Sequence, residues 1–249
     1  MNSIIDGAFK AKDSPDLFAQ FAHRFAFYSV TSKDVDSILS TYPDLEDKLY
    51  YYPGITPLLL IDEETHIITE LHSLNPEFIK SDLSHFYMFK HRVENGDFDS
   101  RDVLQFTDTK YRESVMFSLF NSELDIDNII KRDILEETYS SLEYINDYDS
   151  FRDLFIQLKR YSGDIDLEDE VVIYRGGTDR STDIEEALSW TTSLDVAKFF
   201  STRFDGEQFL FKAKVKKENI LAYINSRNEY EVIVSFEDIY DVLITDFNI

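Results

Sequence analysis

The stretch Val171-Val172-Ile173-Tyr174-Arg175-Gly176-Gly177 marks the point at which the chain changes from helical to strand-like patterns. Its first four residues are apolar, mostly β-branched and typical of a strand, which then runs into an arginine and two glycines. Ser193 is the expected N-cap of one short helix at residues 195–200. Further strands are predicted downstream at residues 208–215, 220–224, 231–235 and 242–245.

The residues before this stretch have mainly helical patterns. Ser14-Pro15-Asp16 predicts a helix start, and phenylalanines follow it at helical spacing. Thr31 is the expected cap of a second helix, and residues 57–61 predict a short strand. Further helices are predicted at residues 81–93, 111–120 and 129–142.

Helices that come first and strands that come later indicate an α+β fold. The polar, acidic segment 163–169 is the expected boundary, although one continuous domain is the alternative. We therefore predict a mainly helical N-terminal region at 1–165 and a second unit at 166–249.

The composition is that of a globular chain. Of 249 residues, 43% are hydrophobic, and 7 Gly and 5 Pro are too few for a linker-rich or disordered protein. The absence of cysteine excludes disulfides and thiolate sites, and it fits a reducing cytosol. The N-terminus has neither a basic start nor an apolar core, and the apolar run 58–61 is too short to span a bilayer. These features predict a cytoplasmic protein without a signal peptide or membrane segment.

The chain has a formal net charge of -24, and residues 171–249 hold only 9 Lys and Arg against 14 Asp and Glu, so most of the excess precedes them. A surface this negative repels nucleic acid and anionic lipid on average, and it favours solubility or a basic partner. It equally fits an ordinary solvated acidic surface. Lys212, Lys214 and Lys216 form a local basic strip on one face of a predicted strand, a pattern that more often belongs to a solvated edge.

Two polar motifs flank the predicted strands. Arg175 presents a fork of donors that matches a pyrophosphate, and the glycines after it permit close approach of a ligand. An arginine in an ordinary turn is the alternative interpretation. Ser189, Thr191 and Ser193 share one face if the segment is extended, and they are suited to hydrogen-bond a carboxylate and a ribose. A hydroxyl-rich helix cap is the alternative there.

Glu229 and Glu231 form the third motif. Two residues apart on an extended segment, they point the same way and repel each other. A cation between or above them would explain the pair, and solvent is the simpler explanation for an isolated pair.

Sequence motifs of other common nucleotide and metal sites are absent. No phosphate-binding Gly-x-x-x-x-Gly-Lys-Ser/Thr loop, no His-Glu-x-x-His pair and no Rossmann fingerprint is present. The five histidines lie outside the three motifs and show no metal spacing, so we expect no metal.

Taken together, the three motifs resemble the mono-ADP-ribosyltransferases of the arginine–serine–glutamate type, which include clostridial binary-toxin enzymes and vertebrate ecto-transferases. The resemblance covers about residues 168–246, and the block 189–200 is similar to bacterial and phage-encoded members. It implies a split, mostly antiparallel β-sandwich that holds NAD, the substrate, in a cleft. No module resembles the first 165 residues, for which target recognition, binding of a neutralising antitoxin or bracing of the catalytic core are the open roles.

The resemblance also implies which residues bind NAD. Arg175 would hold its phosphates and the nicotinamide-side ribose, and the Gly176 backbone would meet the carboxamide. The family's Ser-Thr-Ser corresponds to residues 191–193, which adds Ser193 to the binding residues. Phe199 or Phe200 would stack on nicotinamide, unless both belong to the core.

The catalytic roles follow in the same way. Glu231 corresponds to the catalytic glutamate, expected ionised with a free-glutamate pKa of about 4.3, and either Thr191 or Ser189 would orient it. Glu229 corresponds to the upstream acidic residue, which in the family accompanies arginine acceptors. Residues 225–228 would form the substrate-facing loop, although they lack the aromatic often found there.

Three functions compete on this basis. The first is transfer of ADP-ribose to an arginine of a target protein, in a toxin-like or phage-effector role. The second keeps the enzyme but changes the acceptor to an RNA or DNA base, which the charge of -24 disfavours. The third is a non-catalytic relative that only binds a partner or nucleotide.

Overall fold

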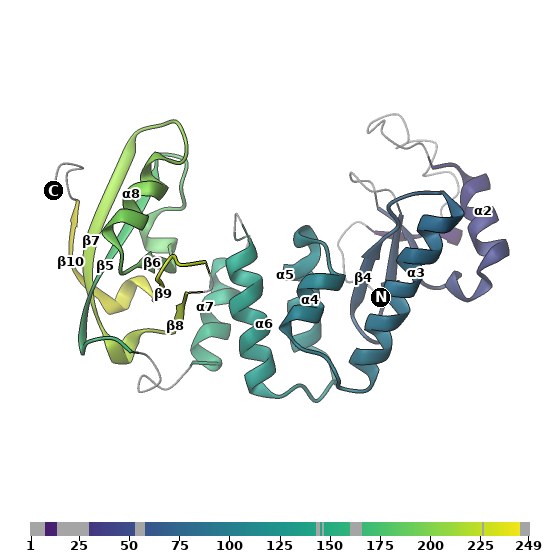
Figure 1. The fold of residues 1–249 in the computed structure, drawn as a ribbon, viewed down its shortest axis with the longest axis horizontal. Coiled ribbons are helices and arrows are strands. Elements are labelled where there is room, and N and C mark those ends of the chain that lie inside the picture. Colours follow the sequence, from purple (N-terminus) through teal and green to yellow (C-terminus); the bar gives the residue numbers. More distant parts are fainter. Residues whose placement is uncertain are drawn as a thin grey trace. The chain divides into compact units, whose positions relative to one another are not determined.

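The computed structural model describes residues 8–13, 30–52, 58–142, 145, 147–159, 166–225 and 227–244. It divides into two compact units, Met1–Leu142 and Glu143–Ile249. Both units contain helices and an antiparallel sheet (Figure 1), which confirms the predicted α+β class. The units divide at residues 142/143, ahead of the predicted 165/166, and residues 160–165 next to the predicted break lie outside the described residues.

The N-terminal unit contains a four-stranded antiparallel sheet in the order β1 (Phe9–Lys10), β2 (Leu49–Tyr51), β3 (Leu58–Asp62) and β4 (Ile67–Glu70). Only β3 was predicted, so the description of this region as mainly helical is incomplete. Every residue of β2, β3 and β4 is buried. Strands that are short and buried on both faces show no polar–apolar alternation, which removes the main sequence signal for a strand.

Helices make up most of the remaining N-terminal unit. They are α2 (Ser32–Thr41), α3 (Pro76–Glu94), α4 (Ser100–Phe106), α5 (Thr109–Phe120) and α6 (Asn128–Ser141), with short 3₁₀ turns η1 (Ala11–Asp13) and η2 (Pro43–Leu45). Thr31 caps α2 through a capping box, as predicted. The helix predicted from Ser14 lies outside the described residues. Among the helices that the structure describes, none is long and apolar enough to cross a membrane.

The C-terminal unit begins with α7 (Tyr148–Gln157) and then builds a six-stranded antiparallel sheet in the order β10-β7-β5-β6-β9-β8. Its strands are β5 (Glu170–Thr178), β6 (Ser189–Thr191), β7 (Gln208–Lys216), β8 (Ala222–Ile224), β9 (Glu231–Ile233) and β10 (Ile239–Ile244). Helix α8 (Leu194–Thr202) packs on β5, and the 3₁₀ turns are η4 (Ile184–Glu186), η5 (Lys217–Asn219) and η6 (Phe236–Asp238).

This sheet consists of two halves joined at one position. β5 pairs with β7 along its whole length, from Glu170 to Thr178. β5 and β6, in contrast, pair only where Tyr174 lies opposite Thr191. The strands β10-β7-β5 and β6-β9-β8 are therefore two three-stranded ladders that meet at this single point.

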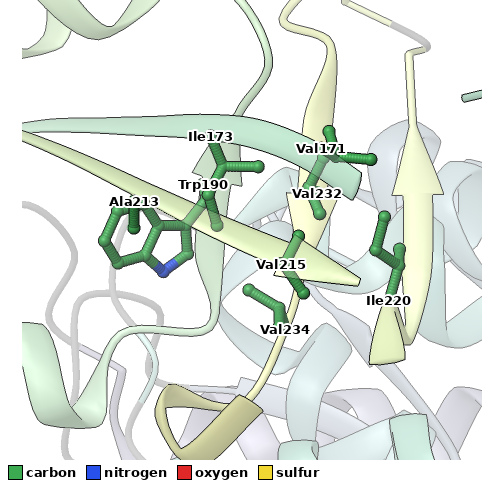
Figure 2. Packing of buried hydrophobic residues seen from close by; sticks show 8 residues of the cluster. All are labelled: Val171, Ile173, Trp190, Ala213, Val215, Ile220, Val232 and Val234. Atoms are coloured by element: carbon green, nitrogen blue, oxygen red, sulfur yellow. The ribbon is translucent and has the colours of Figure 1, made fainter. Parts of the chain in front are cut away.

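One face of the sheet carries the core of the unit. Buried side chains two residues apart on β5 and on β7 point to the same side, as strand geometry requires. Figure 2 shows this cluster, in which Trp190 of β6 is the largest side chain. Its members are Val171, Ile173, Trp190, Ala213, Val215, Ile220, Val232 and Val234. The core spans strands from both halves, so it holds together the region where they meet.

Candidate active site

Arg175 lies one residue beyond the point at which the two halves of the sheet meet. Its guanidinium Nη1 donates a hydrogen bond to the carbonyl oxygen of Ser189, at 2.7 Å. The arginine is half-buried. Its side chain therefore reaches from β5 in one half of the sheet to β6 in the other, and this bond fixes the direction of the guanidinium.

Ser189 also contacts the glutamate that was predicted to be catalytic. Its hydroxyl Oγ donates to Glu231 Oε1 at 2.5 Å. Ser189 lies opposite Ile233 and Thr191 lies opposite Glu231, so Ser189 and Glu231 are diagonal neighbours on one face of the sheet. One residue thus touches both charged groups, through its carbonyl to Arg175 and through its hydroxyl to Glu231.

Thr191, the other candidate for orienting Glu231, has a different role. Its hydroxyl donates to the backbone carbonyl of Glu229 at 2.6 Å and accepts from the backbone N–H of Ser193 at 3.0 Å. The Ser193 hydroxyl in turn accepts from the N–H of Val196 and caps α8. The sequence left Ser189 and Thr191 as rivals, and the geometry assigns the contact with the carboxylate to Ser189.

Glu231 is almost completely buried, with 7% of its surface exposed. Burial raises the pKa of its carboxyl above the ordinary value, because the charged form loses solvation. The Ser189 hydrogen bond and the nearby Arg227 and Arg175 oppose this shift, while Glu229 adds to it. The pKa of Glu231 is therefore displaced upwards from the free-glutamate value on which the prediction of an ionised carboxylate was based.

The segment that joins Glu229 to Glu231 is not extended. Tyr230 has a φ of 50°, in the left-handed region that bulky residues rarely adopt. The inference that both glutamates point the same way assumed extended backbone throughout, so its basis is wrong. Instead, Glu229 Oε2 forms an ion pair with Arg227 Nη2 at 2.7 Å, and Glu231 begins β9.

Packing alone gives a reason for a glycine at position 176, in addition to the predicted contact with NAD. A Cβ atom added there would lie 1.7 Å from the carbonyl oxygen of Ala197, in α8. Only a residue without a side chain lets this helix approach the strand so closely. The helix then presents Phe199 with 61% of its surface exposed, and Phe200 contacts Phe199 edge to face, with ring centroids 5.6 Å apart. Phe199 is therefore not a core residue.

The sequence did not single out two residues of this site, Arg227 and Tyr230. Arg227 lies in the segment predicted to face the substrate, and its spacing of two from Glu229 was the available signal. Tyr230 supplies an exposed aromatic ring, 41% accessible, beside that segment. Its left-handed backbone has no signal in the sequence.

Within the described ranges, no group of three or more His, Cys, Asp or Glu side chains could hold a metal ion. Comparison of the chain with protein-family models, with curated proteins and with solved structures found no match. The chemistry of the site therefore has to be argued from its own side chains.

Proposed function

We propose that this chain is an NAD-dependent mono-ADP-ribosyltransferase that transfers ADP-ribose to an arginine of a target protein and releases nicotinamide. The observation that carries the proposal is the double contact of Ser189. It places a guanidinium and a buried carboxylate, from β5 and β9, around one residue of β6. The resemblance of residues 168–246 to the transferase family requires this convergence of arginine, hydroxyl and glutamate.

In the proposed reaction, Arg175 binds the phosphates of NAD through charge-assisted hydrogen bonds, worth roughly 1.5–3 kcal/mol each. Glu231, as carboxylate, accepts a hydrogen bond from the ribose 2′-hydroxyl. The C1′–N bond to nicotinamide breaks and the electron pair leaves with nicotinamide. The oxocarbenium ion that forms is stabilised by the fixed negative charge of Glu231, as in glycoside hydrolysis.

Glu229 completes the transfer. A nitrogen of the acceptor guanidinium attacks C1′, and its proton passes to the Glu229 carboxylate as the new bond forms. Glu229 is partly exposed, as a group that meets a protein acceptor has to be. The two three-stranded ladders that meet only at Tyr174 and Thr191 are compatible with the split β-sandwich of the family, which we include in the proposal.

An RNA or DNA base is a weaker acceptor candidate. In the basic strip, Lys214 is paired with Glu170 at 2.9 Å and Lys216 lies 3.9 Å from Glu218. Their charge is partly neutralised within the protein, and the chain as a whole is strongly negative. Nucleic acid would meet net repulsion, which disfavours this alternative.

The proposal is tested by incubating the chain with labelled NAD and cell extract, then separating protein from nucleic acid. We expect label on protein and a loss of at least ~10²-fold in turnover for Glu231→Gln, the scale for removing one preorganised electrostatic group. Glu237→Gln is the matched control, since Glu237 is an exposed glutamate of the same unit. Transfer by Glu231→Gln at the wild-type rate would refute the assignment, and label on nucleic acid would change the acceptor.

A further inference from the structure

The carboxylate proposed to receive the acceptor arginine already holds an arginine of the chain itself. Arg227 Nη2 lies 2.7 Å from Glu229 Oε2. This is the contact that an acceptor guanidinium has to make if Glu229 is to take its proton. The same donor chemistry therefore serves both the internal and the external arginine.

The two partners differ in how firmly they are held. The backbone of Glu229 is fixed, because its carbonyl accepts from Thr191 and the next carbonyl, of Tyr230, accepts from the Thr192 N–H at 3.1 Å. The Arg227 side chain is 49% exposed, against 26% for Glu229. An ion pair at this exposure is weak and exchanges readily with solvent. Displacement of Arg227 would thus leave Glu229 in place.

We infer that Arg227 is an internal competitor that occupies the acceptor position on Glu229 and has to be displaced before a guanidinium substrate binds. The inference rests on the proposed function for the identity of that substrate, and on the observed ion pair for the competition itself. A tethered competitor acts at a high effective concentration. It therefore disfavours free arginine and small guanidines, and favours acceptors whose surrounding surface adds binding energy.

The competition is measurable without any NAD cleavage, by calorimetric titration of the full chain with agmatine, a small guanidinium. Arg227→Ala should bind agmatine about two- to fivefold more tightly than wild type, the range expected for losing a competing exposed ion pair. Arg227→Lys keeps the charge but loses the planar fork, and its affinity should lie between the two. In Arg227→Ala, the further change Glu229→Gln should remove the gain.

The matched control is Arg101→Ala. Arg101 forms a comparable exposed ion pair with Asp99, also two residues away, at 2.9 Å in the other unit. An equal gain in agmatine affinity for Arg101→Ala would mean that loss of any positive charge suffices, and would overturn the inference. Unchanged or weaker binding by Arg227→Ala would overturn it directly.

The outcomes also separate this inference from the proposed function. Tighter agmatine binding that depends on Arg227 and Glu229, in a chain that does not cleave NAD, would uphold the guanidinium position and refute the transferase. NAD cleavage with no effect of Arg227→Ala on agmatine binding would uphold the enzyme and refute the competitor. If the transferase activity and the guanidinium position on Glu229 are both upheld, Arg227→Ala should raise transfer of ADP-ribose to agmatine relative to hydrolysis of NAD.

Discussion

Ser189 is the residue on which the proposed site depends most. Its hydroxyl is bonded to an almost fully buried carboxylate, and loss of a partner leaves such a group poorly satisfied, at a cost of about 1–3 kcal/mol. We expect Ser189→Ala to lower the free energy of unfolding by this amount and to reduce transfer about tenfold or more. Denaturant unfolding and labelled-NAD assays measure the two effects.

Thr191→Val is the comparison for that variant. It removes the bonds to the Glu229 carbonyl and the Ser193 N–H, but leaves the bond between Ser189 and Glu231. We expect it to affect acceptor transfer more than NAD hydrolysis. If Thr191→Val abolished hydrolysis while Ser189→Ala left it intact, the assignment of the orienting hydroxyl would have to be reversed.

Glu231 gives a prediction about pH and stability. Its pKa is raised on folding from the ordinary 4.5 by burial, so the folded state binds the proton more tightly than the unfolded state. The wild-type protein therefore loses stability as pH rises from 4.5 through the folded pKa. Glu231→Gln lacks this loss, so its stability relative to wild type should increase as the pH rises from 4.5 towards 8.

The stability difference between Glu231→Gln and wild type should shrink as pH falls towards 4. Thermal or denaturant unfolding across pH 4–8 measures it. Glu237→Gln serves as the control for removing one negative charge from an acidic chain. A difference between Glu231→Gln and wild type that did not vary with pH would contradict the prediction.

At the same scale, the sequence singled out four candidate site residues but not their contacts, and it missed Arg227. Arg175, Ser189, Glu229 and Glu231 were recognisable because their residue types and order suit a pyrophosphate and a cationic sugar. The choice between Ser189 and Thr191 required the register of β6 against β9. The ion pair of Glu229 with Arg227 lies in a segment where Tyr230 is left-handed, a conformation that bulky residues rarely adopt and that the sequence does not signal.

At the scale of elements, the contact between α8 and β5 determines where Phe199 is presented. The helix approaches the strand at Gly176, where an added Cβ would meet the backbone of Ala197 rather than a movable side chain. Gly176→Ala should therefore separate helix and strand and lower the free energy of unfolding by about 3 kcal/mol or more, above the usual cost of overpacking. Denaturant unfolding measures this loss.

Gly177→Ala is the matched control for the helix contact. Its added Cβ would meet the Ser181 side chain, 2.8 Å from Oγ, and a side chain is able to shift. We expect it to cost clearly less than Gly176→Ala. Equal losses for the two variants would mean that general strand strain, and not the packing of α8, explains Gly176.

Element prediction succeeded for several elements that carry a local signal, but it missed the capped helices α4 and α7 and most of the N-terminal sheet. The helices capped by Thr31 and Ser193 and the strand β7 begin within a residue or two of their predicted positions, because caps and alternation are local signals. The N-terminal sheet was largely missed. Its strands β2 and β4 are short and wholly buried, so their partners, which lie far along the chain, decide their conformation.

For the whole molecule, the division into two units at Leu142 and Glu143 yields the last prediction. It assigns α7, whose Phe151 and Phe155 are buried, to the C-terminal unit, and the Lys159 ammonium just beyond α7 donates to the carbonyl of Glu218. A fragment of residues 143–249 should therefore unfold cooperatively. A fragment of residues 166–249 lacks α7 and should be less stable by several kcal/mol, since burying each phenylalanine contributes about 1.5–3 kcal/mol.

Full-length protein with Phe151→Ala controls for the aromatic contribution alone, at about 3–5 kcal/mol. If the shorter fragment unfolded with the same midpoint as the longer one in circular dichroism, α7 would contribute nothing to the C-terminal unit, and the boundary near residue 165 suggested by the sequence would be the better division.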